Sequence, residues 1–237
     1  MNPCVRLSPQ FSGGDNMFYS ISNLCHRSPS SIRMTGVWDA FYRDLMMATA
    51  AGVMTRSGVN VVRSLVRRNE IALIVQHPKE DRIEPDMRSL NSLLVGEASA
   101  TATVLAEMRV PFVCGSSFVL DNAGDTINYC RFLQRQNQKV VTQMLLSSLL
   151  QHIGGKTKKQ AARILRGMDR TAQIHLLLSE FGVDVHLLPD WQQWGDILYW
   201  VEIEGKRHLY TGEGLTAAKP FVIFQHRGEE YRDAEYE

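Results

Sequence analysis

The sequence predicts an α+β fold, with a helical N-terminal and central part followed by a small C-terminal antiparallel β-sheet. Apolar residues recur at helical spacing in several segments before residue 182, and the hydrophobic period changes to two from residue 183 onward. The 237 residues are 44% hydrophobic and 22% charged, close to the average of globular proteins. This composition excludes disordered, collagen-like and coiled-coil proteins.

Composition and pattern divide the chain into four expected segments. They are a loosely ordered arm (1–34), a helical and mixed domain (35–125), a basic helical region (126–183) and an acidic β-rich region with a tail (184–237). The longest uncharged stretch, 140–155, is too short to cross a bilayer. No apolar run near the N-terminus is long enough for a signal peptide. We therefore expect a cytoplasmic protein without a membrane partner.

The elements of the mixed domain follow from local patterns. Helices are expected at 37–53, 59–68 and 90–108, and strands at 71–76, 110–114 and 117–120. Gly58 precedes the second helix, on which Arg63 and Arg67 share one face at i, i+4. Gly115 separates the last two strands.

The second half of the chain reads as three helices and then strands. A long helix at 126–152 has Asp125 as its cap, and helices at 158–166 and 170–181 flank Gly167. Strands are expected at 183–188, 196–203, 207–211 and 220–225. Glu204-Gly205-Lys206 reads as a hairpin turn. The aromatic residues near this turn, Tyr199 and Tyr210 among them, are expected to pack the sheet or to form a protein contact surface.

Charge is distributed unevenly along the chain. Residues 126–179 carry nine basic side chains and one acidic side chain, whereas residues 180–237 carry five basic and twelve acidic ones. Such a basic block attracts polyanions. It could bind nucleic acid, or it could dock on the acidic segment of the same chain or of a partner chain.

The basic block contains a motif built from KTKKQAARILRGMDRTAQIHLLLSEFGV. Ala161-Ala162, Gly167 and the closing Phe181-Gly182-Val183 carry its resemblance to the helix-turn-helix of the factor-for-inversion proteins and of the nitrogen-regulation activators. The resemblance covers residues 156–183 and implies that the second helix enters the DNA major groove. The sequence therefore favours a DNA-binding protein, either a transcriptional regulator or an accessory factor of a nucleoprotein assembly.

The candidate binding residues follow from this interpretation. Phosphate contacts are expected from lysines and arginines, and base contacts from the second helix. The nucleic-acid-binding set is Lys156, Lys158, Lys159, Arg163, Arg166, Arg170, Gln173 and His175, and a secondary basic cluster is Arg63, Arg67 and Arg68. The expected partners are double-stranded DNA or another nucleic acid, together with a protein partner or a second copy bound through the C-terminal β region.

Two alternatives remain open. The chain could be a structural subunit of a larger complex that uses its basic and acidic segments for partner contacts. It could instead be a nuclease, because Asp190, Glu204 and Lys206 look like the PD-(D/E)XK pattern, in which carboxylates hold Mg²⁺ and a lysine aids the attacking water. Asp196 and Glu202 are the fallback carboxylates of that reading. The dispersed histidines and cysteines predict no metal site, and no cofactor is expected.

Overall fold

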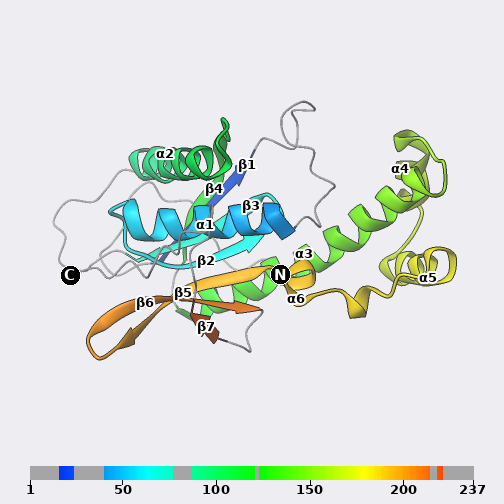
Figure 1. Cartoon of the computed structure of the whole chain (residues 1–237). Coiled ribbons are helices and arrows are strands. Elements are labelled where there is room, and N and C mark those ends of the chain that lie inside the picture. Colours follow the sequence, from blue (N-terminus) through cyan, green and yellow to red (C-terminus); the bar gives the residue numbers. More distant parts are fainter. Residues whose placement is uncertain (1–15, 24–39, 77–86, 121–122, 214–217, 221–237) are drawn as a thin grey trace. The chain divides into compact units, whose positions relative to one another are not determined.

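The chain forms two compact units, the second of which is inserted into the sequence of the first. Figure 1 shows the computed structural model, in which residues 16–23, 40–76, 87–120, 123–213 and 218–220 are described. Unit 1 comprises residues 1–130 and 196–237, and unit 2 comprises residues 131–195. Among the described helices, none is long and apolar enough to cross a membrane.

Unit 1 is built on a seven-stranded sheet with the order β4-β1-β3-β2-β5-β6-β7. Every adjacent pair of strands is antiparallel. The strands are β1 (Asn16–Asn23), β2 (Val61–Arg67), β3 (Glu70–Gln76), β4 (Phe112–Leu120), β5 (Asp196–Ile203), β6 (Lys206–Glu213) and β7 (Ala218–Pro220). The α+β class is confirmed, but the sheet is larger than expected because it combines N-terminal and C-terminal strands.

Two helices, α1 (Ala40–Arg56) and α2 (Met87–Ala106), cover one face of this sheet (Figure 1). The residues of α1 from Leu45 to Met54 are all buried, because the helix lies between the sheet and α2. The core beneath it contains Val66, Leu73 and Leu198, from three neighbouring strands. Burial of these apolar side chains is the main source of the stability of unit 1.

The prediction of a helix at 59–68 is wrong, since residues 61–67 form strand β2 between β3 and β5. The i, i+4 spacing of Arg63 and Arg67 also puts them on one face of a strand, where side chains repeat every two residues. The β-branched residues Val61, Val62 and Val66 favour the extended form. Hydrogen bonding to two partner strands then decides the conformation.

Four smaller expectations also change. Gly115 does not divide two strands. It is the extra residue of a β-bulge in β4, because Cys114 pairs with Ile21 and Ser116 pairs with Ser20. Residues 185–187 form a 3₁₀ turn instead of a strand, since the Asp184 side chain accepts a hydrogen bond from the backbone N–H of His186.

The third change concerns α3 (Ala123–His152), which starts before Asp125, so this residue lies inside the helix. Residues 16–23 of the segment expected as an arm form β1. The rest of that arm, the end of the strand expected at 220–225 and the tail from Arg227 lie outside the described residues.

Unit 2 contains the larger part of α3, followed by α4 (Lys158–Arg166), α5 (Arg170–Phe181) and the short α6 (Asp190–Trp194). The helices α4 and α5 have the predicted bounds because both have strong local signals. Thr157 and Gln160 form a capping box at the start of α4, and Asp169 caps α5. Gly182 ends α5 with φ of 65°, a left-handed conformation that glycine adopts at little cost.

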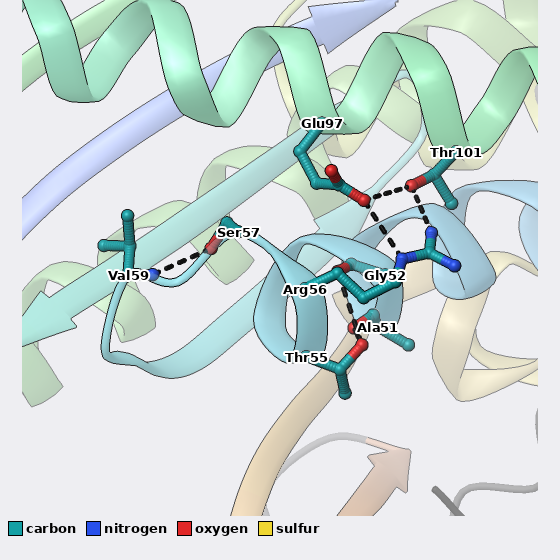
Figure 2. Close-up of polar contacts among 8 residues, drawn as sticks. All are labelled: Ala51, Gly52, Thr55, Arg56, Ser57, Val59, Glu97 and Thr101. Carbon is teal, nitrogen blue, oxygen red and sulfur yellow. Dashed lines mark hydrogen bonds and ion pairs between the residues drawn. The ribbon is translucent and has the colours of Figure 1, made fainter.

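Figure 2 shows α1 and α2 side by side in unit 1, with Gly52 of α1 near Thr101 of α2. A Cβ atom on this glycine would lie 2.6 Å from Nη2 of Arg56 and 2.7 Å from Cγ2 of Thr101. Thr101 is short, branched and buried, so it has little freedom to move away. Gly96, on α2, has no atom within 4 Å of the same position.

We therefore expect Gly52→Ala and Gly96→Ala to change stability in opposite directions. Gly52→Ala should lower the free energy of unfolding by about 1–3 kcal/mol, because overpacking outweighs the gain in helix propensity. Gly96→Ala should raise it by about 0.5–1 kcal/mol, because only the propensity changes. Urea denaturation followed by circular dichroism measures both values. Equal stabilisation by the two substitutions would contradict the close approach of the helices.

Candidate functional site

Unit 2 displays a group of nine basic side chains, which we call the basic group. Its members are Arg131, Arg135, Lys139, Lys156, Lys158, Lys159, Arg163, Arg166 and Arg170. Eight of them are exposed and Arg170 is half-buried. The same 131–195 segment holds four acidic residues. Within the described part of unit 2, no ion pair joins a member of the basic group to an acid.

Helix α4 carries the densest part of the basic group. Lys159, Arg163 and Arg166 recur at i, i+4 and i+7, so they follow one side of the helix. Ala161 is fully buried in the core of unit 2, where its small side chain lets α4 approach the other helices. The folding of α4 therefore turns a run of charges in the sequence into one positively charged surface.

Helix α5 does not present all of the residues expected to contact bases. Gln173 is 3% exposed, and its side-chain Nε2 donates a hydrogen bond to the carbonyl oxygen of Met168 at 3.1 Å. Leu177 is fully buried, whereas the neighbouring Leu178 is 55% exposed. His175 is exposed. Gln173 is thus committed to the interior of unit 2 and is not available for a contact with a base.

The secondary basic cluster lies in unit 1, on β2 and on the turn after it. Arg63 is exposed on β2. Arg67 is buried at the end of this strand, and its Nη2 lies 2.8 Å from Oε1 of Glu70. Arg68 occupies the β2–β3 turn with φ of 51°. The cluster is therefore formed by a strand and its hairpin turn, and not by a helix face as expected.

The start of α3 lies close to this cluster. The pKa of the Cys130 thiol is raised by burial, while the positive charges of Arg63 and Arg67 act in the opposite direction. Burial also raises the pKa of Tyr129, again against the charge of Arg67. The pKa of Arg68 is lowered by burial and by the like charge of Arg67. The β2–β3 hairpin is thus a partly buried site with an excess of positive charge.

An ion pair in unit 1 joins helix α1 to strand β5. Nε and Nη2 of Arg43 donate to the two carboxylate oxygens of Asp196 at 2.7 and 2.8 Å. The side chain of Asp196 is 2% exposed and that of Arg43 is 25% exposed. Asp44 is adjacent, and its pKa is raised by burial and by Asp196, with Arg43 opposing. This two-point contact is structural, because it uses both oxygens of the most deeply buried carboxylate described.

A pocket of about 240 Å³ lies where α1 and α2 cross. Figure 2 shows its polar part, in which Arg56 of α1 reaches Glu97 and Thr101 of α2. The Nε atom of Arg56 is 3.1 Å from Oε1 of Glu97. Ala48, Gly52 and Val104 are among the residues that line the rest of it. The three polar side chains satisfy one another, so they stabilise the helix crossing.

The residues of the predicted nuclease site are divided between the two units. Glu204 and Lys206 flank Gly205 at the exposed turn of the β5–β6 hairpin, which confirms the predicted turn. Asp190 begins α6 in unit 2. Asp196 is held by Arg43, and Glu202 lies on β5. Across the described residues, no group of three or more histidines, cysteines or acids could hold a metal ion.

Comparison with known structures shows which fold this chain has. It aligns with a tRNA(His) guanylyltransferase from Saccharomyces cerevisiae at a TM-score of 0.68 and 12% identity, over 81% of this chain and 90% of that one. It also aligns with a bacterial tRNA(His) guanylyltransferase-like protein in complex with ATP (TM-score 0.64, 13% identity, 86% and 85% covered). The complex of such a protein with GTP gives a TM-score of 0.60 at 10% identity, with 86% and 84% covered. No family model matches the chain, and no curated protein has a similar sequence.

The prediction of a DNA-binding transcriptional regulator is wrong. The fold of the chain is that of the guanylyltransferase structures, and the helix pair α4–α5 is only a small part of it. The helix-turn-helix resemblance arose because a capped helix, a glycine turn and a second capped helix also occur in this unrelated setting. The same likeness gives no support to the alternatives of a structural subunit and of a PD-(D/E)XK nuclease.

We expect Arg43→Gln to destabilise the protein more than Asp196→Asn. Removing Arg43 leaves a carboxylate unpaired in the interior, at a cost of about 3–5 kcal/mol. Removing the Asp196 charge leaves an arginine that still reaches solvent, so the loss should be smaller. The double variant should be more stable than Arg43→Gln alone, because it leaves no unpaired buried charge. Equal losses from the two single variants, measured by urea denaturation, would contradict this account.

Proposed function

We propose that the chain is a nucleotidyltransferase-fold protein that acts on tRNA. The observation that carries the proposal is the shared fold, which extends over most of this chain and most of the tRNA(His) guanylyltransferase structures. Two of these structures contain ATP or GTP. The proposed reaction forms a bond between an oxygen at the RNA end and the α-phosphorus of a nucleoside triphosphate, with loss of pyrophosphate.

The basic group of unit 2 supports binding of RNA. Eight of its nine side chains are exposed, and those of α4 form one charged surface, so they fit the closely spaced phosphates of a folded RNA. Contacts of this kind position the nucleic acid without reading its sequence.

Phosphoryl transfer generally uses divalent cations held by carboxylates. The described acids of unit 1 do not fit such a site, because no group of three or more of them could hold a metal ion and three of them are each paired with an arginine. These are Asp196 with Arg43, Glu70 with Arg67 and Glu97 with Arg56. We therefore derive no step through a metal ion. What the described residues supply is positive charge, at the β2–β3 hairpin in unit 1 and on α4 in unit 2.

Charge reversal on α4 tests the RNA contact. The triple variant Lys158→Glu/Lys159→Glu/Arg163→Glu should weaken binding to tRNA by at least about tenfold and reduce the salt dependence of the affinity, because fewer counterions are released. Arg163→Glu alone should have a smaller effect of the same kind. Arg88→Glu, an exposed arginine of α2 in unit 1, is the matched control. Unchanged binding by the triple variant, in an electrophoretic mobility assay, would refute the contact.

A nucleotide incorporation assay tests the reaction. Purified protein incubated with tRNA transcripts and each α-³²P-labelled nucleoside triphosphate should transfer label to the RNA, as seen by denaturing gel electrophoresis. The triple variant should transfer less label at limiting tRNA. If tRNA and nucleotide both bind but no label is transferred with any triphosphate, the transfer step is wrong.

A further inference from the structure

A row of three side chains crosses unit 1 on neighbouring strands. Arg63 of β2 lies directly opposite Tyr199 of β5, and Tyr199 lies directly opposite Tyr210 of β6. Residues directly opposite each other in antiparallel strands project from the same face of the sheet. The three side chains therefore form a continuous row, which we call the tyrosine row.

The tyrosine row is on the face away from α1 and α2. Leu198, next to Tyr199, is fully buried in the core beneath α1. Trp200, on the other side of Tyr199, packs against the same core, as does Leu209 next to Tyr210. Successive side chains of a strand alternate between the two faces. Both tyrosines therefore point from the opposite face, where they are only half-buried.

The geometry of the two rings suits unstacked bases. The ring centroids of Tyr199 and Tyr210 lie 6.4 Å apart, and the ring planes are inclined by 35°. This separation is nearly twice the rise of about 3.4 Å per nucleotide along one strand of a double helix. Two bases resting on these rings would thus be separated from each other, as in a single strand. Aromatic rings bind unpaired bases in this way with little sequence preference.

Positive charge lies at one end of the row. Arg63 is exposed, and no described ion pair involves it. Arg67 and Arg68 follow on the same hairpin, and Glu70 offsets one of these charges. An arginine beside aromatic rings provides the phosphate contact that accompanies base stacking in proteins that bind single-stranded nucleic acids.

We propose that the tyrosine row binds a single-stranded segment of RNA, with two successive bases on Tyr199 and Tyr210 and a phosphate beside Arg63. That the strand is RNA rests on the proposed function. The base contacts themselves rest on the rings, their spacing and the adjacent arginine. The tyrosine row belongs to unit 1, whereas the basic group belongs to unit 2.

The test uses the full chain and a fluorescein-labelled octauridylate, whose bases stack little on one another. Fluorescence anisotropy should show that Tyr199→Leu/Tyr210→Leu weakens its binding by at least about tenfold. Tyr199→Phe/Tyr210→Phe keeps the rings and should bind like the unchanged protein. Arg63→Gln should weaken binding and lower its salt dependence, whereas the leucine variant should keep the salt dependence of the unchanged protein.

An abasic octamer with the same number of phosphates gives a second readout that needs no variant. The unchanged protein should bind it as weakly as the leucine variant binds octauridylate. Equal affinity for the abasic and the base-bearing octamers would overturn the proposal, as would full binding by a leucine variant with a native circular dichroism spectrum. Loss of tRNA binding in the α4 triple variant, with octauridylate binding retained, would separate the two contacts. Failure of nucleotide incorporation alone would count against the proposed reaction, but it would not contradict RNA binding by the tyrosine row.

Discussion

The pairing of β2 with β5 is the contact on which unit 1 depends. It joins strands that are separated in the sequence by the whole of unit 2. Two side-chain contacts reinforce it: Arg43 binds Asp196 at the start of β5, and Nε1 of Trp200 donates to the carbonyl oxygen of Val61 at 3.0 Å. Because closing so long a loop costs entropy, the sheet forms only when burial of Leu198 and its neighbours compensates for that cost.

Charge is used differently in the two units. The carboxylates of Asp196, Glu70 and Glu97 in unit 1 each form an ion pair with an arginine. These ion pairs join secondary-structure elements to one another. The basic group of unit 2 has no such partners among the described residues. An unmatched set of exposed cations produces a field that attracts polyanions and accelerates their association. Unit 2 is thus suited to attract polyanions, whereas the paired charges of unit 1 stabilise its fold.

The two proposed surfaces differ in physical character, and this gives them separate signatures. Phosphate contacts on α4 should depend strongly on salt and little on the bases. Stacking on Tyr199 and Tyr210 should depend on the bases and little on salt. Arg63 adds a salt-dependent phosphate contact to the stacking, since it lies exposed at the end of the tyrosine row. A protein with both surfaces would bind a folded RNA that carries an unpaired segment.

Local signals in the sequence determined helices α4 and α5 of unit 2 and the β5–β6 turn. Thr157, Asp169, Gly182 and Gly205 act through hydrogen bonds and backbone preferences within a few residues, so they can be read without the fold. The charges of the basic group could also be identified from the sequence without the fold. Only the tertiary structure decided that residues 61–67 form a strand, that Gln173 is buried and that Arg63, Tyr199 and Tyr210 share a row. These features depend on pairing between strands far apart in the sequence, whose register no local pattern specifies.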